Sequence, residues 1–416
     1  MGEKLAVKWR TGRQLKPKEI FKRLNKYRKT EDGKVSFSSF EIDDAETAIY
    51  SMLDFNEEIS CTIKSSLIRE ALFKITGELN ESTCLNYINN AWKRKKRTKE
   101  ENFFLLTTIS ISKTFPLVQI SINGCKVSLL KGHFPKKYNS RNKIFDKYKW
   151  AKDISPNGYR NVIVSTKSRF IYDAVEKCLD ALDLLRTFIC FYANHAMQYS
   201  FGGGYKTLPI NRVILGGVHT LHNSKGQLAI SNEIFWYLPN FQEIEIYKEK
   251  DDSRNIYKKN LRLLVSKYER SNIKKDLKKS ILNYIKGYDQ IDYHQNLIMS
   301  WAAFELLLSN GTNNNDSISR RSSFLWDDYE YHKQIVEHLR HYRNIHVHTG
   351  EASDSAKTHC YQLQRYYKQL IYYYLLKASE CKSLSEANSF LDLSKDIVEL
   401  KQQKLMLEKA IKFRGN

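Results

Sequence analysis

The chain has 416 residues, of which 42% are hydrophobic, and its 68 lysines and arginines against 46 acidic residues give a formal net charge of +22. A chain of this length exceeds the size at which one hydrophobic core usually stops growing, so two domains are expected. The positive charge favours a polyanionic partner, for which nucleic acid is the natural candidate.

Targeting signals and cysteine content indicate the cytosol. The first ten residues contain no apolar run typical of a signal peptide, and Ala6 occupies the position where a myristoylation motif requires Ser or Thr. No segment approaches the roughly 18 apolar residues of a membrane span, so no membrane partner is expected. The seven cysteines include no Cys-x-x-Cys pair, which suits neither a zinc site nor a disulfide scaffold. We therefore expect a cytoplasmic protein.

The first part of the chain, residues 1–169, predicts a basic α+β domain with an antiparallel sheet. A short helix is expected to begin near Pro17. Runs rich in Thr, Ile, Val and Phe, separated by turn residues, are typical of antiparallel strands. These runs are 103–112, 117–122, 125–130 and 162–165. We expect this domain to act as a sensor or to bind a partner or RNA.

A basic run in this domain is a candidate nucleic-acid contact. It consists of Trp92, Lys93, Arg94, Lys95, Lys96 and Arg97. In one interpretation the indole stacks on a base while the neighbouring cations contact phosphates. In the other, the run is the exposed basic end of a helix.

The second part, residues 170–416, predicts a mostly helical domain. Apolar residues at helical spacing indicate one long helix over 171–197, and turn and short-strand signals near 200–240 interrupt the helical pattern. Further helices are expected at 241–271, 274–288, 291–309, 328–348, 353–380 and 384–412. The predicted fold class is thus an α+β N-terminal domain followed by an all-α helical bundle.

Most of the functional information lies in Arg343, Asn344 and His348, which form an Arg-Asn-x-x-x-His array just before Gly350. Arginine holds phosphate through several fixed donors and histidine titrates near neutrality, so the pair has the parts that metal-free RNA cleavage requires. On a helix Arg343 and His348 diverge by about 140°, so they meet only near a helix end or across an interface. Gly350 can close the helix, because glycine tolerates the left-handed backbone found there. His348 then lies in the last turn, where the negative end of the helix dipole favours a protonated imidazole.

The spacing of Arg343, Asn344 and His348 also has interpretations without any catalytic role. Such pairs are common in a chain rich in arginine and histidine, and the array is also compatible with a solvated helix end. A metal cluster of neighbouring histidines is disfavoured because no cysteine or carboxylate spacing supports it. The histidines concerned are His332, His338, His341, His346 and His348. No metal and no cofactor are therefore expected.

The context of the array makes it more informative. An apolar stretch at 291–309 carries Trp301 and, four positions later, its single glutamate, Glu305, and a polar linker separates it from the Arg343 helix. This order resembles the HEPN superfamily, in particular its ApeA-like and abortive-infection branches, in which a Trp-x-x-x-Glu helix precedes an Arg-(Asn/Asp/His)-x-x-x-His helix. The resemblance covers about 170–380.

The strongest part of this resemblance is 295–350. The segments 181–186 and 209–211 also look like longer members of the ApeA-like branch. Residues before 170 resemble no family that we can name.

The resemblance implies a helical bundle that dimerises so that two Arg-x4-His motifs face one another in a composite, metal-independent ribonuclease site. His348 would be the general base or acid, Arg343 would neutralise charge on the phosphoryl oxygens, and Asn344 would orient the phosphate or the histidine. Glu305 would support the cleft, although a purely structural ion pair is equally compatible. Attack by the 2′-hydroxyl would leave a 2′,3′-cyclic phosphate and a 5′-hydroxyl, and DNA would survive.

The resemblance thus predicts an endoribonuclease that acts as a toxin-like effector in anti-phage defence, by abortive infection. The expected partners are RNA, with tRNA as one candidate, a second copy of the chain in a homodimer or dimer of dimers, and a phage-derived trigger or regulatory protein. Gly350 stands where AMPylated HEPN toxins carry tyrosine, so that regulation is not expected. The alternative is a non-catalytic HEPN module that binds nucleic acid or a partner protein. A metal-dependent DNA nuclease ranks last because no convincing carboxylate array supports it.

Overall fold

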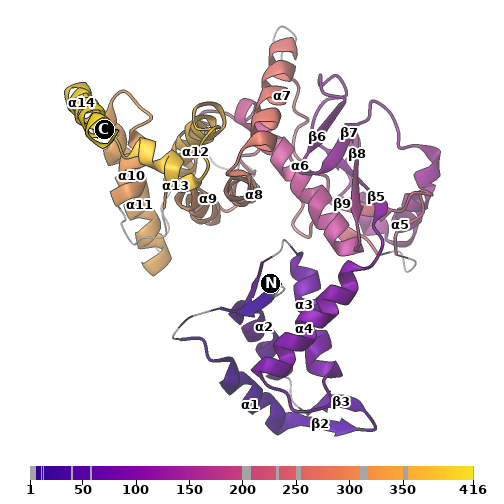
Figure 1. Ribbon diagram of the computed structural model, residues 1–416. Coiled ribbons are helices and arrows are strands. Elements are labelled where there is room, and N and C mark those ends of the chain that lie inside the picture. The colour runs from indigo at the N-terminus through magenta and orange to yellow at the C-terminus, as the bar shows by residue number, and fades with distance from the viewer. Residues whose placement is uncertain are drawn as a thin grey trace. The chain divides into compact units, whose positions relative to one another are not determined.

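The computed structural model describes residues 6–10, 12, 14–38, 41–56, 59–198, 208–230, 234–249, 254–309, 316–345 and 355–415, and 346–349 as helix backbone. Helices and an antiparallel sheet combine in a mixed α+β fold, which confirms the coarse class predicted from the sequence (Figure 1). The chain forms two compact units, the first made of 1–105, 165–178 and 221–231, and the second of 106–164, 179–220 and 232–416. Within the described ranges, no helix combines the length and apolar content of a membrane-spanning segment.

The first unit is helical, with two small antiparallel strand pairs. Its helices are α1 (Pro17–Tyr27), α2 (Glu41–Met52), α3 (Cys61–Lys74) and α4 (Glu81–Lys96). Its strand pairs are β1 (Val7–Trp9) with β4 (Leu53–Phe55), and β2 (Arg28–Glu31) with β3 (Lys34–Phe37). A capping box begins α4, because the Asn80 side chain accepts bonds from the Ser82 and Thr83 amides while the Thr83 hydroxyl accepts from the Asn80 amide.

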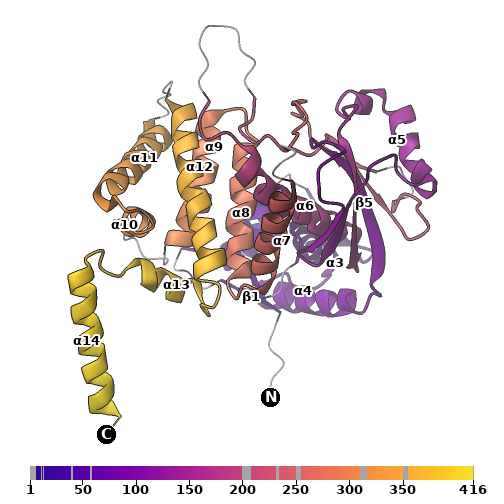
Figure 2. The same ribbon diagram turned by 90° about the horizontal axis from the view of Figure 1, so that it is seen from above.

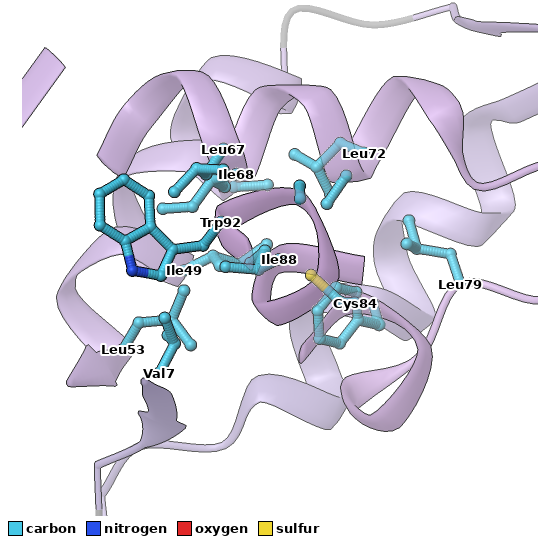
Figure 3. Close-up of a cluster of buried hydrophobic side chains, with 14 of the residues drawn as sticks. Val7, Ile49, Leu53, Leu67, Ile68, Leu72, Leu79, Cys84, Ile88 and Trp92 are labelled. Carbon is cyan, nitrogen blue, oxygen red and sulfur yellow. The ribbon is translucent and has the colours of Figure 1, made fainter. Parts of the chain in front are cut away.

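Buried aliphatic side chains from these helices form the core of the first unit (Figure 3). Leu67 and Ile68 of α3 and Ile88 of α4 are each 0% exposed. Buried Asn89 accepts a bond from the Val7 amide and donates one to the Val7 carbonyl, at 3.1 and 3.0 Å. This amide therefore satisfies the backbone of β1 where it enters the core.

The sheet has six strands in the order β10-β9-β5-β8-β7-β6. Their bounds are β5 (Glu101–Ile109), β6 (Gln119–Ile122), β7 (Cys125–Leu129), β8 (Arg160–Ser168), β9 (Val218–His222) and β10 (Trp236–Tyr237). Each of the four strand runs predicted from the sequence overlaps one of these strands, so a strand in each run is confirmed. A two-residue turn at Asn123 and Gly124, both with positive φ, joins β6 to β7 as an Asn-Gly hairpin requires.

The sheet takes strands from both sides of residue 169, the domain boundary predicted from the sequence. The strands β5 to β8 precede that residue, and β9 and β10, from the predicted insertion at 200–240, follow it. The compact units therefore divide the chain at other points. The roles assigned to 1–169 and 170–416 stay predictions.

Helices make up most of the rest of the second unit, and Figure 2 shows α8, α9 and α12 side by side. The helices are α6 (Ile171–Ala193), α7 (Arg254–Arg270), α8 (Lys274–Tyr288), α9 (Tyr293–Leu308), α10 (Asp316–Ser323), α11 (Tyr329–Thr349), α12 (Ala356–Tyr372), the π-helical turn Tyr373–Lys377, α13 (Leu384–Leu391) and α14 (Ile397–Arg414). Of α6, residues 171–178 fall in the first unit and the rest in the second. At Gly287 an added Cβ would lie 3.1 Å from Met299 Cβ and 3.2 Å from Ser300 N, so glycine allows α8 to pack closely on α9.

Two predicted helices are wrong in part. The helix expected at 241–271 begins only at Arg254, because Tyr247 pairs with the sheet edge through bonds to the backbone of Ser110 and Ser112, each 2.9 Å long. The helix expected at 384–412 is two helices. Asp392 ends α13, where it is held by arginines of α10, and Asp396 caps the first turn of α14 by accepting from Val398 N.

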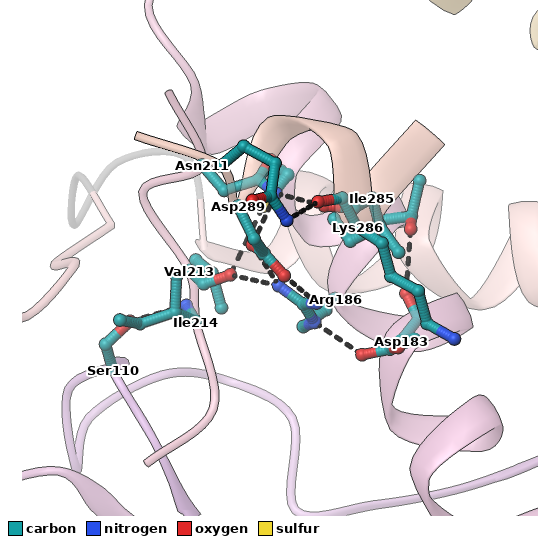
Figure 4. A network of polar contacts seen from close by, with 12 residues as sticks. Ser110, Asp183, Arg186, Asn211, Val213, Ile214, Ile285, Lys286 and Asp289 are labelled. Carbon is teal, nitrogen blue, oxygen red and sulfur yellow. Dashed lines mark hydrogen bonds and ion pairs between the residues drawn. The ribbon is translucent and has the colours of Figure 1, made fainter. Parts of the chain in front are cut away.

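A buried charge network ties α6 to the end of α8 (Figure 4). Arg186 donates from Nε to Asp183 at 2.8 Å and from Nη1 to Asp289 at 2.7 Å, and its Nη2 also bonds Asp289. Asn211 donates to the same Asp289 carboxylate at 2.8 Å and to the Ile285 carbonyl at 2.9 Å. The segments 181–186 and 209–211 thus meet in one polar network.

Leu67→Ala should lower the free energy of unfolding of the first unit by about 2–5 kcal/mol, because it leaves a cavity in a fully buried cluster. Leu407→Ala is the matched control, since Leu407 lies on helix α14 and is 64% exposed, and its effect should stay within about 0.5 kcal/mol. Urea denaturation followed by circular dichroism measures both. Equal effects of the two substitutions would contradict the packing described here.

Candidate active site

Three residues singled out from the sequence, Trp301, Glu305 and Arg343, lie together in the second unit. Trp301 and Glu305 are one turn apart on α9, so they share one face of that helix. The helix begins at an Asp292 cap, whose carboxylate accepts from His294 N at 2.8 Å. Arg343 reaches this face from α11.

The Arg343 guanidinium contacts α9 in two ways. Its Nη2 donates to Glu305 Oε2 at 2.9 Å, and its Cζ lies 5.5 Å from the centre of the Trp301 ring. The ion pair is half-buried, with Arg343 23% and Glu305 38% exposed in their side chains. A cation over an indole face and a charge-assisted hydrogen bond both restrict the guanidinium, so it is oriented by α9 as well as by the helix that carries it.

Two N–H groups in this contact have no hydrogen-bond acceptor among the described residues. Arg343 Nε is buried and finds no hydrogen-bond partner there, and the same holds for Trp301 Nε1. The bond to Glu305 uses one of the five donor hydrogens of a guanidinium. The guanidinium therefore keeps donors that Glu305 does not use.

The remaining motif residues are only partly described. Asn344 is half-buried on α11, next along the helix from Arg343. The backbone of His348 belongs to α11, which runs to Thr349 and confirms the predicted helix. The His348 side chain, and the whole of Gly350, lie outside the described residues. The structure thus brings Arg343, Glu305 and Trp301 together and leaves the position of the imidazole a prediction.

Histidine and tyrosine contacts hold α11 against α12. His332 Nδ1 lies 2.7 Å from the Tyr366 hydroxyl, and His338 Nε2 lies 3.1 Å from His359 Nε2. The Tyr342 ring, adjacent in sequence to Arg343, has its centre 4.2 Å from that of the His359 ring. The contacts run along α11, and the one made by Tyr342 lies in the turn that carries Arg343.

The role of His359 was not foreseen from the sequence, since a lone histidine on an otherwise buried helix face carries no motif. Its only signal is the spacing of His359, Leu363 and Tyr366 along one face of α12. In the part of the chain that the structure describes, no group of three or more His, Cys, Asp or Glu side chains is arranged to hold a metal ion.

The basic run predicted to bind nucleic acid closes α4 in the first unit. Trp92 is 6% exposed and packs in the core, with its ring centre 6.2 Å from that of Phe170. A ring in this position offers no free face to a base, so the stacking role predicted for Trp92 is corrected to a core role.

The cations that follow Trp92 lie at the surface, as predicted by the interpretation of this run as the exposed basic end of a helix. Lys93, Arg94, Lys96 and Arg97 are exposed and Lys95 is half-buried. Arg94 and Lys95 lie 3.7 and 3.4 Å from the carboxylate of Glu70. Part of the positive charge of the run is thus compensated within the first unit, and contact of these residues with phosphates stays a prediction.

Comparison of the chain with protein-family models, with curated proteins and with solved structures finds no match.

Folding should become less favourable in acid because of His359. Burial, followed by the charge of His338, lowers the pKa of His359 from 6.5 to about 4. Between these values the unfolded chain binds a proton that the folded chain does not, so stability is lost as the pH falls from about 6.5 towards 4.

His359→Gln removes this proton uptake and should reduce the fall in Tm between pH 7 and pH 5. His341→Gln, at an exposed position of α11, is the control and should leave the pH dependence as in the wild type. Thermal melts at several pH values measure both. A pH dependence unchanged by His359→Gln would contradict the assignment of a neutral, buried imidazole.

Proposed function

We propose that this chain is a metal-independent endoribonuclease of the HEPN type. The observation that carries the proposal is the contact of Arg343 with Glu305 and Trp301, which joins the two motifs on which the family resemblance rests. In sequence these motifs are 38 residues apart. Such a contact is what an arginine needs in order to meet a phosphate in one fixed orientation.

The chemistry follows from an arginine and a histidine near a ribose phosphate. His348 as general base takes the proton of the 2′-hydroxyl, and the 2′-oxygen attacks the adjacent phosphorus. The bond from phosphorus to the 5′-oxygen breaks, and that oxygen receives a proton from an imidazolium, which leaves a 2′,3′-cyclic phosphate and a 5′-hydroxyl. Arg343 stabilises the negative charge that grows on the non-bridging oxygens, and Asn344 orients the phosphate or the imidazole.

This reaction requires both a base and an acid, and the sequence provides one Arg-Asn-x-x-x-His array per chain. A second copy of the chain supplies the second imidazole in the proposal, so the active form is a homodimer or a dimer of dimers. RNA is the substrate, with tRNA as one candidate. The net charge of +22 favours association with a polyanion.

In the cell we propose a toxin-like role in abortive infection, which rests on the family resemblance alone. Unrestrained RNA cleavage harms the host, so activity in this proposal is gated by a phage-derived trigger or a regulatory partner.

A second candidate is a non-catalytic HEPN module that binds nucleic acid or a partner protein. The observation in its favour is the same ion pair, because a half-buried arginine that bonds a glutamate and lies over an indole also serves as a purely structural link between α9 and α11. The two candidates differ in whether the chain cleaves RNA.

Arg343→Ala and His348→Ala should each reduce RNA cleavage by at least about 100-fold, because each removes a group that acts in the transition state. The assay is purified protein with total RNA in excess EDTA, read by gel and by the cyclic phosphate at the new 3′ ends. Arg340→Ala and His341→Ala on the same helix are matched controls and should retain activity.

Loss of cleavage on addition of EDTA would exclude the metal-free reaction. Full activity of the Arg343→Ala and His348→Ala proteins would exclude these residues. Wild-type protein that binds RNA without cutting it, at every protein concentration tested, would favour the non-catalytic module.

Glu305→Gln should lower cleavage by roughly tenfold while Tm changes little, because the amide keeps the size of the side chain but loses the charge that orients Arg343. Glu330→Gln is the matched control, since Glu330 lies on α11 with 66% of its side chain exposed. Activity and Tm are measured on the same preparations. A loss of activity only in proportion to a loss of folded protein would assign Glu305 to stability alone.

A further inference from the structure

A pocket of about 410 Å³ lies in the second unit, away from the Arg343 residues in sequence and built entirely from residues 108–161. Most of its walls come from the connection between β7 and β8, which contains the 3-10 helices Lys136–Arg141 and Lys149–Lys152 and helix α5 (Asn142–Lys147). Thr108 of β5, Lys113 of the segment that follows β5, and the start of β8 complete the lining. Two loops, 130–134 and 155–161, are joined at its edge, because Leu130 N donates to Asn161 O at 2.8 Å and the Asn161 amide donates to Gly132 O at 2.9 Å.

Two arginines in the walls of this pocket are almost fully buried, Arg141 at 4% and Arg160 at 1% exposure. Arg160 donates to the carbonyls of Phe115, Leu129 and Leu130 at 2.8–3.0 Å. Each of its three nitrogens is thereby fixed by main chain.

Arg141 is held in the same manner. It donates to the carbonyls of Leu106 and Val218 at 3.1 and 3.2 Å and to the Thr220 hydroxyl at 2.7 Å. Within the described ranges, neither Arg141 nor Arg160 forms an ion pair with a carboxylate. Both guanidinium charges are thus held in place by neutral groups.

The charge of these arginines is not offset by the rest of the pocket. Lys113 and Lys131, both exposed, also line it, and the lining residues between 108 and 161 include no Asp or Glu. Glu249 acts on Arg160 from a distance, but it is itself paired with Arg254 at 3.0 Å. Burial lowers the pKa of Arg141 to about 9, so its guanidinium remains protonated at neutral pH. A buried cation without a counter-charge is costly, and a bound anion removes that cost.

Aromatic and amide side chains complete the pocket. The Arg141 guanidinium lies 5.4 Å from the centre of the Phe134 ring and 5.1 Å from that of Phe145, and both rings are half-buried in the pocket wall. The lining also includes Asn142 and Asn157, which are exposed and offer donors and acceptors. Planar rings beside fixed cations suit a ligand that carries both a heterocycle and a phosphate.

We infer that this pocket binds a free nucleotide, with its phosphates at the exposed Lys113 and Lys131, attracted by the buried charges of Arg141 and Arg160, and its base against Phe134 and Phe145. A volume of about 410 Å³ lies in the range of sites for one small molecule. A nucleic-acid strand instead requires a long groove of exposed cations. This inference is independent of the ribonuclease proposal, because none of its residues belongs to the Arg343 site.

The test is ligand binding by the full-length chain, measured by thermal shift and by calorimetry. The probes are ATP, GTP, CTP and UTP, the corresponding monophosphates, adenosine, pyrophosphate and a short 5′-phosphorylated oligodeoxynucleotide. At least one nucleotide should raise Tm at millimolar concentration, because a ligand that binds only the folded chain stabilises it, and adenosine should not. RNA cleavage plays no part in this readout.

Lys113→Ala combined with Lys131→Ala should weaken nucleotide binding by roughly tenfold or more, because two phosphate contacts are lost at exposed positions that the fold does not need. Lys126→Ala is the matched control: Lys126 is exposed on β7 and is not among the lining residues, so binding should be unchanged. The exposed lysines are preferred to Arg141, whose loss would also break backbone bonds.

Three outcomes would overturn the inference. The first is the absence of any shift with all the nucleotides and with pyrophosphate. The second is binding of pyrophosphate as tight as that of the nucleotides, which would make the pocket a site for inorganic anions. The third is oligodeoxynucleotide binding that is tighter than nucleotide binding and equally sensitive to the lysine substitutions, which would assign the pocket to a strand end.

Discussion

The second unit depends on the buried guanidinium of Arg186. With 3% exposure it bonds Asp183 on its own helix, Asp289 at the end of α8 and the Val213 carbonyl of the segment that leads into β9. Burial by itself would lower the pKa of the Arg186 guanidinium. The attraction of the Asp183 and Asp289 carboxylates is larger, so the pKa of Arg186 is raised. Removing Arg186 would leave the Asp183 and Asp289 carboxylates without their shared cation, so the guanidinium holds α6, α8 and the approach to the sheet in one arrangement. Because α8 packs closely on α9, the same constraint extends to the helix that carries Trp301 and Glu305.

Buried arginines in this unit are compensated in different ways. Arg186 and Arg321 each bond an aspartate through two nitrogens, and the bonds from Arg321 lower the pKa of Asp392. Arg343 has a half-buried glutamate and an indole face. Among the described residues, the acceptors bonded by Arg141 and Arg160 are all neutral oxygen atoms. A carboxylate thus neutralises Arg186 and Arg321 fully, whereas Arg343, Arg141 and Arg160 are neutralised in part or not at all. Ligands that carry negative charge are proposed to bind near these last three arginines.

Local sequence pattern predicted much of the fold, and it failed where distant partners decide the structure. Strands β6 and β7 alternate between apolar and polar residues, β5 is a run of strand-favouring residues, and the helix at 274–288 has a clear apolar face, so all of them were predictable. The stretch 241–249 was not, because its backbone bonds go to Ser110 and Ser112, more than 130 residues earlier. Trp92 was misjudged for a related reason: the cations beside it are visible in the sequence, whereas the core that covers its ring is not. The contact of Glu305 with Arg343 was within reach of the family resemblance, but the pocket around Arg141 had no sequence motif.

The π-helical turn Tyr373–Lys377 has a consequence for how this chain tolerates length changes. Such a turn arises when one residue is inserted into an α-helix, since its bonds skip five residues instead of four. Here the wider turn places Tyr373 to donate to the Ala387 carbonyl and Tyr374 to donate to the Leu307 carbonyl and to Asn388, at 2.6–3.0 Å. Deleting one residue in it would restore an ordinary helix, yet rotate every later residue by about 100° and separate these tyrosines from their acceptors. The one extra residue of the π-helical turn is thus what lets the end of α12 bond to both α9 and α13.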